Sequence, residues 1–282
     1  MKFTIKTMVL LFVAFAVQTN INAQGVKLPQ ASSGQTIIQD FGLGKITLTY
    51  SRPNTKGRKI FGALEPFDKV WRTGANSATV IKFTDDVTIE GILVPAGEYG
   101  LFTIPNKTEW TFILSKNPKQ WGAYTYKESE DVLRVKVKPM SIKPKVETFT
   151  MQFANVLPTS GQLHIMWEKT ALTINIMTSI DEKVMASIDA AMKTDKKPYF
   201  AAAQYYLENG KDLGTALAWI NEAEKADQKA PYIKLWKGKI QLKMGDKKGA
   251  QETAAAGITL ATEQKNEEYV RLNSQLLADA KK

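Results

Sequence analysis

The sequence contains no cysteine and a single histidine, His164, among its 282 residues. Without cysteine the chain has no thiol nucleophile, no disulfide and no Cys-ligated zinc or iron–sulfur centre. One histidine cannot build a His-rich zinc site, and without a nearby acid and nucleophile it cannot form a catalytic triad. His164 lies in an alternating run at residues 163–168, where we expect it to line the surface of a strand.

The common short motifs of catalysis and nucleotide binding are also missing. No G-x-S-x-G elbow, Walker A loop or G-x-G-x-x-G turn after a strand occurs. A glycoside hydrolase would need two carboxylates about 5–9 Å apart across a cleft. The sequence does not show which of five available glutamates would meet in this way: Glu65, Glu98, Glu109, Glu147 and Glu168. We predict no catalytic residue, metal site or cofactor, and leave open whether the protein is an enzyme.

The first residues have the pattern of an export signal. Two lysines precede an unbroken apolar run at residues 8–17, and Ala23 offers a small residue for cleavage. The run is shorter than the ~20 residues of a membrane-spanning helix, and no later segment approaches that length. No cysteine follows it, which excludes a lipid-anchored lipoprotein. We expect residues 1–23 to be removed and the soluble chain to be exported, to the periplasm or cell envelope or beyond it. Mass spectrometry would then find a mature N-terminus near Gln24.

Alternation with a period of two dominates residues 24–179. Gly and Pro turn signals separate about nine or ten short alternating runs, as in all-β proteins. The clearest of these runs lie at 45–50, 87–90, 110–114, 132–137, 146–153, 163–167 and 172–177. No helix-length periodic run interrupts them, which argues against a βαβ arrangement. We predict an antiparallel β-sandwich of jelly-roll type for residues 24–179.

The apolar period becomes helical after Ser179. Helices are predicted at 180–192, 198–209, 213–227, 231–244, 247–261 and 265–280. Three positions recur thirty-four residues later, so that Asp212, Ala216 and Ala223 return as Asp246, Ala250 and Gly257. Small residues at such positions let paired antiparallel helices approach closely. The region resembles the tetratricopeptide repeat over about 80 residues. We therefore predict an α+β protein whose residues 180–282 form an all-α helical-hairpin domain.

Basic residues concentrate between positions 51 and 72, in a chain whose formal net charge is +10. This stretch contains six basic residues, Arg52, Lys56, Arg58, Lys59, Lys69 and Arg72, and only two acidic residues, Glu65 and Asp68. The segment at 70–76, V-W-R-T-G-A-N, joins an apolar anchor to a Gly-Ala turn. Such a turn could present backbone N–H groups to an anion beside the arginine guanidinium.

Aromatic residues also gather at 121–126, W-G-A-Y-T-Y, in a turn region where no strand requires them. Aromatic faces beside arginine suit sugars and planar anions. We predict a ligand-binding site made by Arg52, Lys56, Arg58, Trp71, Arg72, Asn76, Trp121 and Tyr124. The structural alternative is that Trp71, Trp121 and Tyr124 pack on the core, Arg72 pairs with Glu65 or Asp68, and Asn76 caps a turn.

Several motifs combine in this part of the chain. They are S-R-P at 51–53, K-G-R-K-I-F at 56–61, V-W-R-T-G-A-N at 70–76, P-A-G-E-Y at 95–99, L-F-T-I-P at 101–105, W-G-A-Y at 121–124 and D-V-L-R at 131–134. Together they resemble the exported bacterial proteins known as domain of unknown function 2911, over roughly residues 30–177. The resemblance implies an exported β-rich domain, sometimes followed by helical repeats, and no established activity.

These observations favour an exported, non-enzymatic binding or adaptor protein of the cell envelope. The β-domain would bind an anionic small molecule or glycan, and the helical repeats would contact a protein partner or the β-domain itself. Nucleic acid is not expected as a partner. One alternative is a hydrolase acting on envelope or imported carbohydrate, and another is a purely structural scaffold. Two facing carboxylates would favour the hydrolase, whereas a basic, aromatic-walled pocket without them would favour binding.

Overall fold

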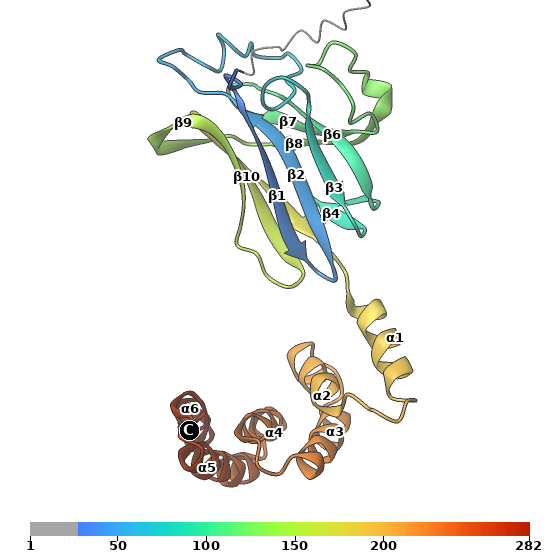
Figure 1. Ribbon diagram of the computed structural model, residues 1–282, viewed down its shortest axis with the longest axis vertical. Coiled ribbons are helices and arrows are strands. Elements are labelled where there is room, and N and C mark those ends of the chain that lie inside the picture. Colours follow the sequence, from blue (N-terminus) through green and yellow to red (C-terminus); the bar gives the residue numbers. More distant parts are fainter. Residues whose placement is uncertain (1–27) are drawn as a thin grey trace, which may run out of the picture. The chain divides into compact units, whose positions relative to one another are not determined.

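The computed structural model describes residues 28–282, so the predicted signal at residues 1–23 lies outside the described residues. The chain divides into a β unit that ends near Ile176 and a helical unit that runs from Met177 to Lys282. Ten strands precede six helices in the described range (Figure 1). The predicted α+β class, with antiparallel sheets followed by helices, is confirmed. The exact domain boundary at residue 179 stays a prediction.

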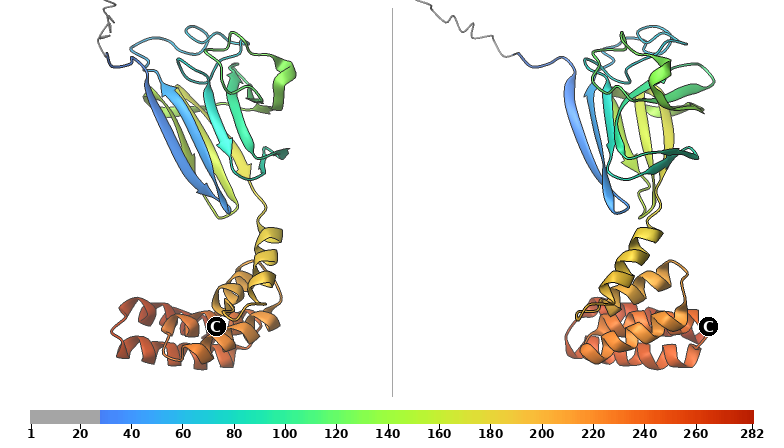
Figure 2. Two further views of the ribbon diagram at one scale, coloured as in Figure 1. Left: turned by 45° about the vertical axis from the view of Figure 1, so that its right-hand side comes forward. Right: turned by 90° about the vertical axis from the view of Figure 1, so that its right-hand side faces the viewer.

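The β unit consists of two sheets, which Figure 2 shows as two layers. Six strands form one sheet in the order β1-β2-β3-β6-β7-β8, and four form the other in the order β5-β4-β10-β9. The bounds are β1 (Ser33–Phe41), β2 (Gly44–Arg52), β3 (Thr79–Phe83), β4 (Val87–Ile89), β5 (Ile92–Val94), β6 (Gly97–Ile104), β7 (Trp110–Ser115), β8 (Asp131–Val137), β9 (Met140–Ala154) and β10 (Ser160–Met177).

Alternating apolar side chains fill the space between the two sheets. In β2, Ile46, Leu48 and Tyr50 are buried while the residues between them are less so. Because side chains of a strand point alternately to opposite faces, one face of each strand supplies the core. Strand β7 departs from this pattern, since all six of its residues are buried. It pairs with β6 on one side and β8 on the other.

Strand β10 doubles back on itself. The Nε2 of Gln162 donates to the Oδ1 of Asn175 at 3.0 Å, although 13 residues separate them. A straight strand would hold these residues about 40 Å apart. Glu168, midway between them, has a φ of +55°, and the pairing with β9 shifts register on both sides of it. The two runs predicted at 163–167 and 172–177 are therefore the two arms of one folded strand.

The helices of the helical unit begin and end close to the predicted positions. They are α1 (Asp181–Ala191), α2 (Tyr199–Glu208), α3 (Leu213–Ala226), α4 (Pro231–Lys243), α5 (Lys247–Glu263) and α6 (Glu267–Lys281). Asp212 and Asp246, the recurring acids, cap the N-termini of α3 and α5 by accepting a backbone N–H. Within residues 28–282, no helix is long and apolar enough to cross a membrane.

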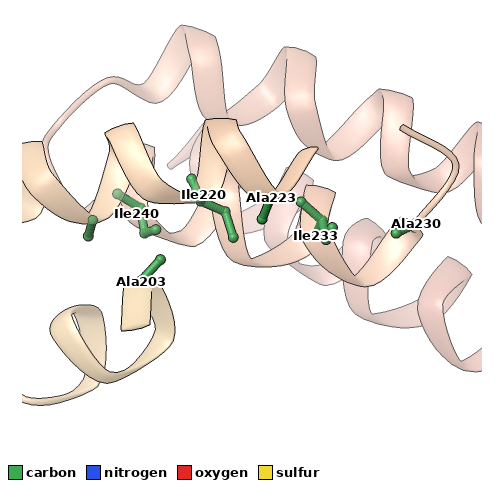
Figure 3. Packing of buried hydrophobic residues seen from close by; sticks show 7 residues of the cluster. Ala203, Ile220, Ala223, Ala230, Ile233 and Ile240 are labelled. Carbon is green, nitrogen blue, oxygen red and sulfur yellow. The ribbon is translucent and has the colours of Figure 1, made fainter. Parts of the chain in front are cut away.

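Small residues bring these helices together, as Figure 3 shows for the cluster around Ile220. Ala216 and Ala250, the second pair of recurring residues, are completely buried. Gly257 packs so closely that a Cβ there would lie 2.4 Å from the Oδ1 of Asn273. This close packing is consistent with the predicted tetratricopeptide-like arrangement of helical hairpins.

Two long connections lie at the same end of the sandwich. One runs from β2 to β3 and the other from β7 to β8, and both occupy the upper end of the β unit in Figures 1 and 2. They carry all of the predicted ligand-binding residues except Arg52, which is the last residue of β2. Loops on a rigid scaffold are where binding residues most often occur, so the candidate site is sought there.

Candidate functional site

The turn that follows Trp71 has an unusual backbone. Thr73 and Asn76 have φ values of +52° and +59°, and Gly74 has a φ of +152°. A positive φ is a genuine outlier for a β-branched residue such as threonine. A Cβ on Gly74 would lie 3.0 Å from the carbonyl oxygen of Ser51, which explains the glycine. Strained backbone of this kind concentrates at functional sites, which makes the turn a candidate on conformational grounds.

Buried hydrogen bonds hold the turn in this conformation. Thr79 Oγ1 donates to the carbonyl oxygen of Thr73 at 2.6 Å, and Trp71 Nε1 donates to that of Gly74 at 3.1 Å. Thr73 Oγ1 lies 3.0 Å from Thr103 Oγ1. Because Thr73, Gly74 and Ala75 are all buried, the turn itself faces the interior. Arg72, which is half-buried, is the residue that extends from it toward the surface.

Trp71 belongs to the core. Its side chain is 3% exposed, and its ring stacks on Trp167 at a centroid distance of 5.8 Å and an interplanar angle of 16°. It also meets Phe149 edge-on at 5.2 Å, and Phe61 and Trp110 complete the cluster. This position matches the structural alternative, in which Trp71 packs on the core. The Trp71 ring therefore does not face a ligand.

The aromatic loop docks directly against the turn. The N–H of Gly122 donates to the carbonyl oxygen of Asn76 at 3.1 Å, and the N–H of Ala78 donates to that of Gln120 at 2.9 Å. Gly122 has a φ of +68°, and a Cβ there would lie 2.7 Å from the Tyr124 ring. These contacts bring two segments together that are more than forty residues apart in the sequence.

Trp121 and Tyr124 are the most exposed aromatic side chains of the site. Trp121 is 67% exposed and Tyr124 is 84% exposed. Exposing a large aromatic ring forgoes the free energy gained by burial and leaves its face available to a ligand. The alternative that they close the end of the core does not match these exposures.

Arg72 lies beside this loop without a bonded partner. Its Nη1 is 3.5 Å from the position that a Cβ on Gly122 would occupy. Its Nε is enclosed by protein and makes no hydrogen bond to any residue of the described range. Buried polar groups are usually hydrogen-bonded, and exceptions call for an explanation. A guanidinium that lacks an acceptor and lies beside a loop with two exposed aromatic rings could receive an anion through its Nη groups.

Glu65 supplies the nearest compensating charge. Burial raises the pKa of its carboxyl from 4.5 to about 7, against the opposing attraction of Arg72 and then Arg58. Neither arginine forms an ion pair with Glu65 within residues 28–282. Below pH 7 the carboxyl is therefore largely neutral, and the two guanidinium groups keep their positive charge uncompensated.

The other predicted basic residues are placed differently. Arg52 donates from Nε to the carbonyl oxygen of Phe149 at 3.1 Å and from Nη2 to Thr150 Oγ1 at 3.0 Å, so it fastens β2 to β9. Arg58 donates to the carbonyl oxygens of Asn54 and Thr55 within its own turn. Its side chain remains exposed, as does that of Lys56.

The fold thus gathers some of the predicted residues and separates others. Arg72, Asn76, Trp121 and Tyr124 meet at one surface, which we call the Arg72 surface. Asn76 donates weakly from Nδ2 to Ser51 Oγ at 3.3 Å. Sequence reasoning named Glu65 as a pairing partner of Arg72 and as one of five available glutamates, and it missed Gly122 as the residue that admits Arg72. The signal that could have identified Gly122 was its place between Trp121 and Tyr124.

The described part of the chain offers little for metal or triad chemistry. No group of three or more His, Asp or Glu side chains in residues 28–282 could hold a metal ion. The His164 ring lies 3.2 Å from Gln162 Oε1, on the less buried face of β10, where it was expected. What the site offers is positive charge, hydrogen-bond donors and aromatic faces.

A family model described as "Protein of unknown function (DUF2911)" matches residues 32–176, more than half of the chain. The chain therefore belongs to this family, as its motifs suggested. No curated protein and no solved structure matches it.

Proposed function

We propose that the β unit is a non-enzymatic binding domain of an exported envelope protein, and that the Arg72 surface receives an anionic small molecule or glycan. The observation that carries this proposal is the guanidinium of Arg72, which makes no hydrogen bond to any residue of the described range, together with the exposed rings of Trp121 and Tyr124. A carboxylate or phosphate would accept hydrogen bonds from its Nη groups.

The ligand would be held by two kinds of contact. Arg72 supplies a planar fork of donors that matches the oxygens of a carboxylate or phosphate. Trp121 and Tyr124 supply faces against which a sugar ring or planar group packs. The backbone beneath them is rigid, because the Trp71–Asn76 turn is held by buried hydrogen bonds. A preformed site loses less conformational entropy on binding.

Glu65 makes binding depend on pH. Because its pKa is raised to about 7 by burial, the carboxyl becomes negatively charged as the pH rises through neutrality. The new charge then competes with the ligand for Arg72 and Arg58. An anion should therefore bind more tightly at pH 6 than at pH 8, and the difference should disappear in Glu65→Gln.

A ligand screen on the full chain tests the proposal. Citrate, phosphate and glucose 6-phosphate are each added while the melting temperature and tryptophan fluorescence are recorded. A ligand at a hundred times its dissociation constant stabilises the native state by about 2.7 kcal/mol. At ~2–4 °C per kcal/mol the melting temperature should rise by several degrees. Because Trp121 is exposed, its fluorescence should also change, and Trp121→Phe should abolish that signal.

Arg72→Ala should keep the fold and lose the shift, while Arg72→Lys should keep only part of it. Arg271→Ala is the matched control, since it removes an exposed arginine from the helical unit. If no anion shifts the wild type and Arg72→Ala unfolds the β unit, Arg72 has a structural role and the proposal is wrong.

A specific observation favours a second role for the helical unit, the capture of a protein partner. A groove of about 380 Å³ runs beside the starts of α2 and α4, with Phe200 and Tyr232 meeting edge-on at 5.0 Å in its lining. Helical repeats use such grooves for extended peptides. Chemical cross-linking in the native envelope should capture a partner with the wild type and lose it with Tyr232→Ala; equal capture by both would refute this role.

A further inference from the structure

A cleft of about 460 Å³ opens in the β unit, and none of its lining residues belongs to the Arg72 surface. It lies among four turns, namely the β2–β3 connection, the β6–β7 turn, the β8–β9 turn and the bend of β10. The side chains that matter for its chemistry are Phe61, Phe67, Lys107, Ser141, Glu168 and Lys169. Its volume falls within the ~300–1,000 Å³ of small-molecule sites.

Glu168 is the one carboxylate in this lining, and the bend of β10 places it there. Its φ of +55° is unusual for a residue with a side chain. One carboxylate oxygen, Oε2, accepts the backbone N–H of Ile60 at 3.2 Å. No hydrogen bond within residues 28–282 is recorded for the other oxygen, Oε1. Glu168 is therefore held in position by one oxygen and has the other available to accept a hydroxyl.

Two ammonium groups stand near this carboxylate in the lining. Lys107 and Lys169 are exposed, and neither forms an ion pair with an acid of the described chain. Two lysines against one glutamate leave the cleft with a net positive charge. An anionic group could therefore be held at its mouth.

The aromatic wall of the cleft is rigid. Phe61 meets Trp110 edge-on at a centroid distance of 4.6 Å, and Trp110 is 2% exposed. Phe67 folds over Gly62, where a Cβ would lie 2.4 Å from the Phe67 ring. Gly62 has a φ of +80°, so it also needs the conformational freedom of glycine. The chain thus holds two half-buried phenyl rings at the cleft.

We infer that this cleft binds one sugar ring that carries a carboxylate, that is, a uronic acid. The apolar face of the ring packs against Phe61 and Phe67. A ring hydroxyl donates to Glu168 Oε1, and the carboxylate is held by Lys107 and Lys169. A simple anion would have no hydroxyl to donate to Glu168 and would gain nothing from the aromatic rings. A neutral sugar would leave both lysines unpaired, so only an acidic sugar uses all three features.

Titration calorimetry on the full chain tests this inference with D-glucuronate, D-glucose and acetate. Glucuronate should bind at least ten times more tightly than either of the other two. Glu168→Gln keeps an acceptor for the Ile60 N–H and should weaken glucuronate binding about tenfold, because a charge-assisted hydrogen bond is lost. The double variant Lys107→Gln/Lys169→Gln should reduce glucuronate to the affinity of glucose.

Lys82→Gln is the matched control, since Lys82 is an exposed lysine of β3 outside the cleft. It should leave glucuronate binding unchanged. Arg72→Ala should likewise leave the cleft unaffected while removing the anion response of the Arg72 surface, so the two proposals fail separately. If Glu168→Gln perturbs the near-ultraviolet circular dichroism, the lysine double variant decides alone, because its side chains are exposed.

Two results would overturn the inference. One is that glucuronate at millimolar concentration does not bind. The other is that it binds equally well to the wild type and the lysine double variant. Loss of glucuronate binding in Arg72→Ala together with normal binding in the double variant would assign the sugar to the Arg72 surface instead.

Discussion

Two segments of the β unit, at residues 70–76 and 121–124, each contain a tryptophan, but one tryptophan is buried and the other is exposed. Both combine a tryptophan with glycine and alanine in a loop. Trp71 is 3% exposed and lies among four aromatic rings, whereas Trp121 is 67% exposed and forms only a backbone bridge to Ser77. Amino-acid composition alone therefore does not show whether a tryptophan in such a loop stabilises the core or lies on the surface. The segments that pack against it in the folded chain decide this.

Backbone pairing explains the difference. Trp71 exchanges two hydrogen bonds with Thr103 of β6, at 2.7 and 2.9 Å, so it behaves as an added residue of the sheet. Its side chain must then point either into the core or away from it, and it points in. Trp121 precedes Gly122, whose positive φ turns the chain, and its ring stays 67% exposed.

The largest effect should come from removing the buried ring. Trp71→Ala should lower the free energy of unfolding of the β unit by about 3–5 kcal/mol, the usual cost of truncating a buried aromatic residue. Trp121→Ala should change it by less than about 0.5 kcal/mol, as for other exposed positions. Hydrogen exchange of β7 peptides in the full chain measures both. Similar losses in the two variants would contradict the contrast between core and surface.

A smaller effect should separate two of the three arginines between residues 51 and 72, namely Arg52 and Arg72. Arg52→Ala removes two charged hydrogen bonds to β9 and should cost about 1.5–3 kcal/mol. Arg72→Ala removes no hydrogen bond to a described residue and should cost less. The same exchange measurement, read from β9 peptides, compares them. The assignment of structural and binding roles is reversed if Arg72→Ala proves the more damaging.

The smallest effect concerns Glu65, whose carboxyl interacts electrostatically with Arg72 and Arg58. Burial raises its pKa to about 7 in the folded protein, from an ordinary value of 4.5. Between these pH values only the folded state holds the proton, so the unfolding free energy falls as the pH rises. Partial solvent access limits the loss to about 1 kcal/mol.

Glu65→Gln isolates this contribution, because an amide does not titrate. The stability of the wild type relative to Glu65→Gln should decline between pH 4.5 and 7 and then become constant. Denaturant unfolding at several pH values gives the difference. A constant difference across that window would mean that the carboxyl keeps an ordinary pKa.

Much of the fold was predictable because it depends on local periodicity. Alternation located the strand arms of β10 at 163–167 and 172–177, and the helical period located α3 and α5 within a few residues. Asp212 and Asp246, which recur thirty-four residues apart in the sequence, are the N-caps of α3 and α5. Such signals need only neighbours along the chain.

The candidate site was less predictable. Arg52, Arg58 and Arg72 look equivalent in the sequence, yet Arg52 bonds to β9, Arg58 bonds to its own turn and Arg72 has no bonded partner. These differences depend on which strands become neighbours. The cleft at Glu168 was missed because its turn, Glu168-Lys169, contains none of the residues that usually mark turns.

The sequence by itself determined the absence of thiol chemistry, the family, the α+β order of the elements and the positions of the helical repeats. Tertiary structure alone decided that Trp71 is core, that Trp121 and Tyr124 are exposed beside Arg72, and that β10 bends to aim Glu168 into a cleft. The physical reason is how far apart in the sequence the interacting residues lie. Secondary structure follows the period of apolar residues over a few positions, whereas a binding surface needs side chains from distant segments to meet.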